Sequence, residues 1–176
     1  MKYILGIDIG TSTTKAVAYT TTGKVIAHHN VASNHSTDRS GYHETDPRQL
    51  LDAVITVISD AVIQAGEAPA AISFSAAMHG IMAVDEQGVP LTDILTWADL
   101  RSNGYALKLR NSRTGKKLYE RTGTPVHPMS PLCKLMWMKE QLPDVFERAH
   151  KFISIKEYIF FHFFGEFIVD HSIASA

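Results

Sequence analysis

The chain opens with an apolar strand that carries one carboxylate near its end and runs into a turn of glycine and hydroxyl residues. The stretch reads Ile4-Leu5-Gly6-Ile7-Asp8-Ile9-Gly10-Thr11-Ser12-Thr13-Thr14-Lys15. An unpaired carboxylate is costly to bury, so Asp8 is expected at the sheet edge, facing a cation or a phosphate. Gly10 can adopt backbone angles that other residues avoid, and the N–H groups of residues 11–13 can form an anion-binding nest. The pattern indicates a phosphate-binding β-hairpin with a Mg²⁺-associated Asp8; an ordinary hairpin with a polar turn also fits it.

Composition separates the chain from several classes of protein. It has 176 residues, of which 45% are hydrophobic and 20% charged, enough for a substantial core. The net charge is −1 without a long basic run, and the apolar stretch 158–164, expected to form a buried helix, is too short to span a bilayer. Neither nucleic acid nor a membrane is therefore expected as a partner. Cys133 is the only cysteine, which fits a reducing compartment such as the cytoplasm.

Hydrophobic periodicity predicts an α/β fold with a mixed sheet flanked by helices. An antiparallel meander of strands is expected over 3–9, 14–20 and 25–31. A helix then begins after Thr45 or Asp46, with Pro47 in its first turn, and ends at Gly66. The apolar run 70–76 is expected to be a central, buried strand parallel to the first.

Shorter elements are expected in the second half of the chain. They are a hairpin over 81–88, helices running to about residue 110 and over 115–122, 132–141 and 155–164, and a strand over 152–154.

A second polar group follows the predicted strand 70–76. It consists of Met78, His79 and Gly80. In open α/β sheets ligands bind outside the carboxyl ends of strands, so this turn and Asp8 are expected to share one cleft. His79 could equally be a structural histidine that bonds a nearby backbone group.

A third group is Trp97-Ala98-Asp99-Leu100-Arg101. Trp97 offers a flat apolar face on which a sugar ring or chain can lie. Asp99 can accept hydrogen bonds from hydroxyls or cap the helix that runs to about residue 110, and these two roles are compatible. Arg101 can fix that carboxylate or reach an anionic group as a fork.

Taken together, these residues resemble the N-terminal domain of the FGGY family of carbohydrate kinases. The resemblance rests on segments 8–15, 78–80, 97–101 and 169–175, which occur in the family's order. It implies an actin-like, ribonuclease-H-like domain that transfers the γ-phosphoryl group of ATP to a sugar hydroxyl. Within the family, segments 121–132 and 155–160 look like gluconate kinases, which implies D-gluconate as the substrate and its 6-hydroxyl as the acceptor.

The resemblance also implies roles for individual residues. Asp8 would help to hold Mg²⁺, mostly through water. The phosphates of ATP would be approached by Gly10, Thr11, Ser12, Thr13 and Lys15. The sugar would be lined by Met78, His79, Trp97, Asp99 and Arg101. Because gluconate is an acid, a cation should meet its carboxylate, and the candidates are Arg101, Lys134 and Lys156.

One catalytic group that the resemblance implies is missing. The family uses an Asp from a later Gly-Asp segment as the base, and residues 1–176 contain no such segment. We therefore expect residues 1–176 to be an incomplete N-terminal sugar-kinase domain that is inactive alone. The base is expected beyond Ala176, and the C-terminal adenosine-binding domain is absent from this chain. Apolar surface around 160–169 is expected to stay exposed and to drive self-association, for instance as a homodimer.

Two alternatives stay open. The substrate could be another sugar such as xylulose, within the same family. The chain could instead be a non-catalytic sugar-binding or interaction module that kept the fold without the second lobe. The reading frame after Ala176 discriminates: continuation through a Gly-Asp segment and a Gly-rich adenosine site supports the enzyme, whereas a stop codon supports the module.

Overall fold

The structure, a computed structural model, describes residues 2–34, 36–37 and 40–175. They belong to two compact units, which are described one after the other. The first unit lies within residues 1–35 and 45–77, and the second within 36–44 and 78–176. Among the described residues, no helix combines the length and the apolarity needed to cross a membrane.

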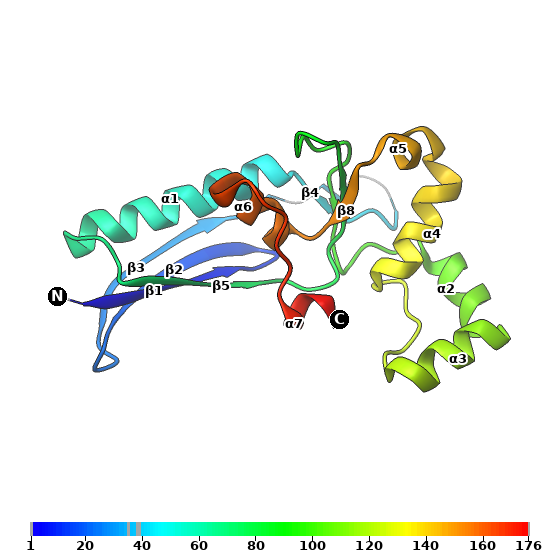
Figure 1. Ribbon diagram of the computed structural model, residues 1–176, viewed down its shortest axis with the longest axis horizontal. Helices are drawn as coiled ribbons and strands as arrows, with labels where there is room; N and C mark the ends of the chain where they lie inside the picture. The colour runs from blue at the N-terminus through cyan, green and yellow to red at the C-terminus, as the bar shows by residue number, and fades with distance from the viewer. Residues whose placement is uncertain (1, 35, 38–39, 176) are drawn as a thin grey trace. The chain divides into compact units, whose positions relative to one another are not determined.

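The first unit is built on a four-stranded sheet with the strand order β3-β2-β1-β5 (Figure 1). Its strands are β1 (Tyr3–Ile9), β2 (Thr13–Thr20), β3 (Val25–Ala32) and β5 (Ala71–Ala76). β1, β2 and β3 pair antiparallel, and β5 pairs with β1 in parallel. The predicted mixed sheet of a meander plus one parallel strand is therefore confirmed.

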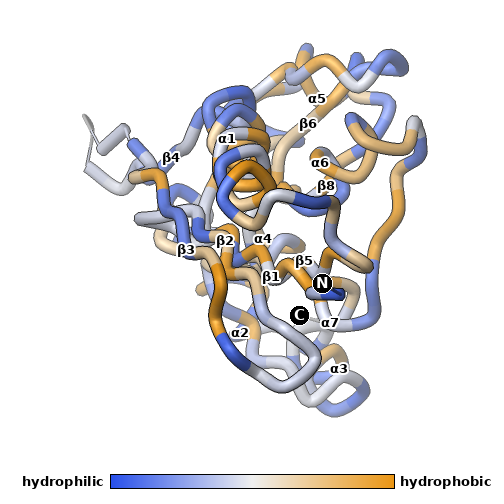
Figure 2. Tube along the Cα trace, turned by 90° about the vertical axis from the view of Figure 1, so that its left-hand side faces the viewer, coloured by the Kyte–Doolittle hydropathy of each residue, from blue (hydrophilic) through white to orange (hydrophobic). Residues whose placement is uncertain are grey.

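Alternation of side chains along β1 decides which face of the sheet is buried. Tyr3, Leu5, Ile7 and Ile9 are at most 2% exposed, whereas Asp8 lies on the opposite, exposed face. Helix α1 (Pro47–Ala65) covers the buried face (Figure 1). Its turns alternate between hydrophobic and hydrophilic residues in Figure 2, as expected of an amphipathic helix with one face in the core.

The ends of α1 are where the sequence predicts them. The Asp46 carboxylate accepts a hydrogen bond from the Arg48 N–H at 2.8 Å, so Asp46 rather than Thr45 is the N-cap. Pro47 occupies the first turn, where its missing N–H has no cost. Gly66 ends the helix in the left-handed region, at a φ of 79°.

The prediction that β5 is a central, buried strand is wrong for the described chain. β5 lies at the edge of the sheet, next to β1 alone, and Ile72 is 40% exposed. A short apolar run looks the same in a central strand and at an edge, because periodicity reports side-chain character rather than the number of neighbouring strands.

The second unit combines short strands and helices around its own core. Its strands are β6 (Met82–Val84), β7 (Ile94–Leu95) and β8 (Lys151–Ile153), and β4 (Glu44–Thr45), where the chain passes between the units, pairs with β7. Its helices are α2 (Asn103–Arg110), α3 (Arg113–Thr122), α4 (Pro131–Gln141), α5 (Pro143–Arg148), α6 (Ile155–Phe164) and α7 (His171–Ala174). A core cluster joins Ile81, Leu95 and Met138.

Several of these elements depart from the prediction. The turn 85–88 forms, and the chain beyond it folds back on β6 through a bridge from Val84 to Pro90 and a hydrogen bond from the Leu91 N–H to the Ala83 carbonyl at 2.8 Å. The regular strand partner of β6, however, is the distant β8. Helix α6 begins at a capping box of Ser154 and Glu157, as its sequence allows. It is buried in its first half, and Phe164 at its end is 61% exposed. The expectation of a buried helix therefore holds only for the first half, and the expected exposure of apolar side chains around 160–169 is confirmed.

Candidate active site

The first group of candidate residues lies on the exposed face of the first unit's sheet. Asp8 on β1 is paired in register with Lys15 on β2 and with Ser75 on β5. Partners in register point to the same side of a sheet, so these three side chains gather there. They line a shallow hollow of about 390 Å³ together with Gly6 and Ser73. Asp8 is one residue from the end of its strand, as predicted.

The turn after β1 is tight, and its glycine is required by space. The Gly10 N–H donates to the Thr13 carbonyl at 3.1 Å, and the Ser33 N–H donates to the Ser12 carbonyl at 3.0 Å. A Cβ at position 10 would lie 2.9 Å from the Thr13 oxygen. Gly10 is not among the described glycines with positive φ, so the expected use of unusual backbone angles is wrong and close approach replaces it.

Two hydroxyl groups beside this turn lack hydrogen-bond partners within the described chain. They are Oγ1 of Thr14 and Oγ of Ser33, both buried. A buried hydroxyl without a partner costs about 1–3 kcal/mol, so an orphaned pair marks a place where polar groups are held for another purpose or share an ordered water. Sequence reasoning did not single out Ser33, which no motif marks.

The carboxyl ends of β1 and β5 lie side by side. The Ala77 N–H donates to the Ile9 carbonyl at 2.9 Å, just past the last ladder pair, Ile9 with Ala76. The prediction that the strand 70–76 runs parallel to the first is confirmed, and the two strands end at the same level.

Asp8 fits a magnesium ion that is shared with phosphates better than one held by the protein alone. In the part of the chain that the structure describes, no group of three or more His, Cys, Asp or Glu side chains is arranged to hold a metal. Mg²⁺ commonly keeps several waters and uses one or two carboxylates plus substrate phosphates. A single exposed carboxylate beside a tight glycine turn matches that mode of binding.

The second group lies in the second unit and centres on Arg101. Its Nε donates to both oxygens of Asp99 at 3.0 Å, and its Nη2 donates to Asp99 at 2.8 Å and to Glu44 at 2.6 Å. The guanidinium lies over the rings of Tyr42, at 4.1 Å, and Trp137, at 4.6 Å. Burial alone would lower the pKa of Arg101, but its hydrogen bonds to Asp99 and Glu44 outweigh burial and raise it.

Asp99 binds loops together and does not cap a helix. Helix α2 begins after Ser102, whose hydroxyl donates to the Pro128 carbonyl at 2.7 Å. The Asp99 carboxylate instead accepts from the His43 N–H at 2.9 Å and from the Arg101 N–H at 3.1 Å. The alternative that Asp99 caps this helix is therefore wrong. The partners Tyr42, Glu44 and Trp137 were missed because they come from distant segments that no local pattern links to Asp99.

His79 occupies an unusual backbone conformation. Among the described residues other than glycine, His79 is the only one with a positive φ, and its value is 64°. Its Nδ1 is buried without a hydrogen-bond partner in the described chain. Burial, and then the nearby Lys134 and His127, lower its pKa, so the imidazole is neutral at pH 7. Met78 and Trp97 are both exposed, Trp97 by half of its surface.

The three candidate cations for a substrate carboxylate are all bound by protein acceptors. Arg101 pairs with Asp99 and Glu44. The Lys156 Nζ lies 2.6 Å from the Asp170 carboxylate. Lys134 is fully buried, and its Nζ donates to the carbonyls of His79 at 2.6 Å and Thr96 at 2.7 Å.

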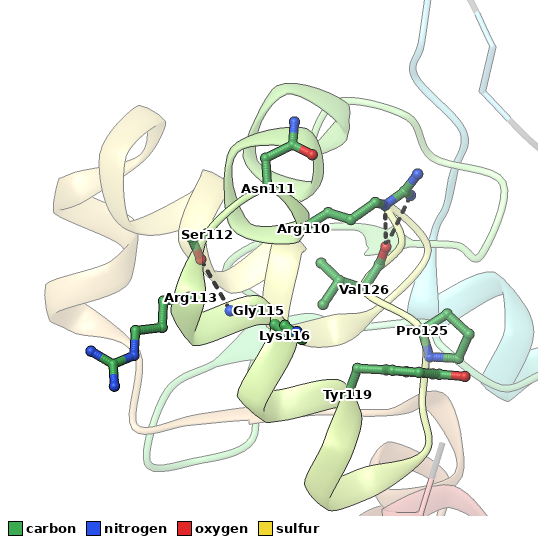
Figure 3. Close-up of a pocket in the computed structure, with 9 residues that line it drawn as sticks. All are labelled: Arg110, Asn111, Ser112, Arg113, Gly115, Lys116, Tyr119, Pro125 and Val126. Carbon is green, nitrogen blue, oxygen red and sulfur yellow. Dashed lines mark hydrogen bonds between the residues drawn. The ribbon is translucent and has the colours of Figure 1, made fainter.

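A further hollow, of about 780 Å³, lies between the α2–α3 turn and the loop at 125–126 (Figure 3). Arg110 donates to the Val126 carbonyl through Nε and Nη2, the Tyr119 ring lies beside Pro125, and Arg113 points away. The predicted site residues do not line it. The volume of a hollow alone therefore does not identify the candidate active site.

The fold and the hairpin define the class of this protein. Residues 3–176 match the N-terminal domain of the FGGY family of carbohydrate kinases, and the chain belongs to that family. Its fold is actin-like and ribonuclease-H-like, with a mixed sheet flanked by helices.

Particular relatives can then be named. Over 175 residues the chain is 43% identical to a gluconokinase of Bacillus licheniformis, covering 99% of this chain and 34% of that protein. The solved gluconate kinase from Lactobacillus acidophilus is 36% identical with a TM-score of 0.95, covering 99% and 35%. A ligand-bound xylulose kinase from the same organism is 36% identical with a TM-score of 0.96, covering 99% and 36%. The chain spans about a third of the length of these proteins.

Proposed function

We propose that this chain supplies the phosphate-binding and sugar-binding elements of an ATP-dependent carbohydrate kinase that phosphorylates D-gluconate on its 6-hydroxyl. The observation that carries the proposal is the 43% identity with a gluconokinase across 99% of the chain. Phosphoryl transfer depends mainly on positioning and charge stabilisation. The polar groups that follow β1 and β5 are of the kinds that could provide both.

The hairpin would form the phosphate side of the site. Asp8 would hold Mg²⁺ through water, and the N–H groups of residues 11–13, in the tight turn that Gly10 permits, would approach the phosphate oxygens. Lys15, beside Asp8 in register, would add positive charge. Bound Mg²⁺ would neutralise the charge that develops on the transferred phosphoryl oxygens.

The second unit would form the sugar side. Met78 and Trp97 expose apolar surface against which a carbon chain can pack. The neutral His79 ring can exchange hydrogen bonds with hydroxyls. Asp99 and Arg101 would shape the loop after Trp97 through their mutual contacts and line the sugar from there.

The base that accepts the hydroxyl proton would come from outside residues 1–176, as would the adenosine-binding domain. The chain alone is therefore expected to have no kinase activity. The test is an assay with ATP and Mg²⁺ that follows ADP release with gluconate, comparing this chain with the protein encoded by the complete reading frame. The complete protein should turn over gluconate and its Asp8→Asn variant should not, whereas robust turnover by the chain alone would contradict this division of roles.

A specific observation favours a second candidate, an uncharged ketose such as xylulose. Arg101, Lys134 and Lys156 are already bound by protein acceptors, so they do not offer an unused charge to a gluconate carboxylate. The structural likeness to a xylulose kinase is as high as that to a gluconate kinase. The ratio of kcat/KM for gluconate and xylulose, measured on the complete protein, decides between them. A ratio below one rejects gluconate.

A further inference from the structure

Lys134 is a buried cation whose hydrogen bonds go to backbone oxygens. It lies in the first half of helix α4 and is fully buried. Burial lowers the pKa of Lys134 to about 8; Asp99 and Cys133 raise it, and Arg101 lowers it further. A buried ammonium is costly, and an apolar side chain of similar volume would usually be at least as stable. A lysine here therefore calls for a role other than packing.

The acceptors of Lys134 belong to two separate loops. One is the His79 carbonyl, at 2.6 Å, in the turn after β5. The others are the Thr96 carbonyl, at 2.7 Å, and the Leu95 carbonyl, at 3.4 Å, at the end of β7 and just before Trp97. An ammonium has three N–H donors, and three acceptors use them all. Lys134 thus has no donor left for a substrate.

The conformation of His79 matches this arrangement. A positive φ is unfavourable for a non-glycine residue and persists only where the surroundings hold it. His79, the residue with this unfavourable φ, is the one whose carbonyl makes the shortest of the three bonds to Lys134. Next to it, a Cβ at Gly80 would lie 3.2 Å from Ile94, so the turn is also packed closely against β7.

We propose that Lys134 is a positioning residue that holds the His79 turn and the Trp97 loop in one fixed geometry for the sugar. The inference rests on the proposed function, because it takes His79 and Trp97 as sugar contacts. Lys134 acts through the backbone carbonyls of these two loops and does not touch the substrate.

The first test uses this chain without a sugar, so that it does not depend on the proposed function. Lys134→Met removes the donors at similar length, and Lys139→Met, an exposed position on the same helix, is the control. The amides of Gly80 and Trp97 report on the carbonyls of His79 and Thr96. In Lys134→Met both amides should shift in NMR spectra and exchange with solvent at least tenfold faster. The pKa of His79 should also rise toward 6.5, because a nearby cation is lost.

Spectra in which Gly80, Trp97 and the His79 titration match those of Lys139→Met would overturn the proposal. If Lys134→Met does not fold, a pH titration of the unsubstituted chain decides instead. A neutral amine has two N–H donors for three acceptors, so both amides should titrate together with a midpoint near pH 8. In the described part of the chain the other titratable or charged groups that face Lys134 are Asp99, Arg101, His79 and Cys133. Burial raises the pKa of the Cys133 thiol, and a Cys133→Ser variant removes that thiol as a control. Separate midpoints, or none, would overturn the proposal.

A second test adds gluconate or xylulose to the chain. Lys134→Met should weaken sugar binding by at least tenfold, while Lys139→Met should not, because small misplacements of binding groups are costly. If the unsubstituted chain binds neither sugar although the sugar-free test succeeds, the assignment of the sugar site fails. The role of Lys134 in holding the His79 turn and the Trp97 loop then still stands. If sugar binding is equal in both variants, the positioning role fails.

Discussion

The buried carboxylate of Asp99 and the guanidinium of Arg101 form a forked pair, with Nε and Nη2 of Arg101 at 3.0 and 2.8 Å from Asp99. Glu44 adds a second acidic partner at 2.6 Å. A pair of this kind costs much to break, because the surviving charge stays buried without compensation. The pair also ties the loop after Trp97 to residues 43–44.

Arg101→Met should destabilise the second unit by about 3–5 kcal/mol, because it leaves Asp99 buried and uncompensated. Chemical denaturation followed by circular dichroism measures this. The double variant Asp99→Asn/Arg101→Met should recover part of the loss, since it removes both charges. Arg121→Met, at an exposed position, should stay within about 0.5 kcal/mol. Equal losses in Arg101→Met and Arg121→Met would show that the pair contributes nothing.

Gly115→Ala should strongly destabilise the packing of α2 against α3. A Cβ at position 115 would lie 2.0 Å from the Leu109 carbonyl oxygen, which is backbone and cannot rotate away. Overpacking of this kind costs about 1–3 kcal/mol or more. Gly104→Ala is the matched control, because a Cβ there meets nothing within 4 Å and alanine favours a helix by about 0.5–1 kcal/mol. In thermal unfolding, the midpoint temperature should fall in Gly115→Ala and rise in Gly104→Ala, each compared with the unsubstituted chain.

Much of the first unit could be predicted because its signals are local. The period-two alternation of β1 and β2 and the caps Asp46 and Gly66 of α1 are written in short windows of sequence. The pairing of β6 with β8 could not be predicted, because each has three residues and the pairing depends on a distant partner. The edge position of β5 was missed for a similar reason, since a strand's neighbours are not encoded within it.

The candidate site divides in the same way. Sequence reasoning predicted Asp8 near the end of the first strand and Lys15 at the start of the second, and the structure adds that the two are paired in register. It did not predict that Arg101 would be enclosed by Tyr42, Glu44 and Trp137, since residues from three segments converge only in the folded chain. The three cations proposed for a substrate carboxylate could therefore not be judged from sequence.

Acid should loosen the C-terminal helix α7 through Asp170. Hydrogen bonds from Lys156 and Ser172 hold the pKa of this N-cap carboxyl well below its ordinary value of 3.8. A depressed pKa contributes stability that is present above the unfolded value and is lost as pH falls below it. NMR signals of residues 171–174 should therefore stay in place near pH 4 and shift only at lower pH, where the carboxyl is protonated in the folded chain. In Asp170→Asn this pH dependence should vanish, and its survival would contradict the assignment.

Gly10→Ala should distort the hairpin that carries Asp8. The new Cβ would lie 2.9 Å from the Thr13 carbonyl oxygen, so either that oxygen moves or the Gly10 hydrogen bond to it breaks. Gly6→Ala is the control on the same strand, because its Cβ would lie 3.8 Å from the Val17 oxygen, an ordinary contact. We expect Gly10→Ala to lose about 1–3 kcal/mol of stability and Gly6→Ala to lose little.

Hydrogen exchange separates a local change at this turn from a general loss of stability. In Gly10→Ala the amide at position 10 should exchange at least tenfold faster, while amides in the middle of β1 and β2 keep most of their protection, because the clash is confined to the turn. The same variant should reduce the NMR shifts that ATP with Mg²⁺ is expected to cause at Asp8 and Lys15, because a distorted turn would displace the N–H groups of residues 11–13. An unchanged response together with faster exchange would separate the turn's structural role from phosphate binding.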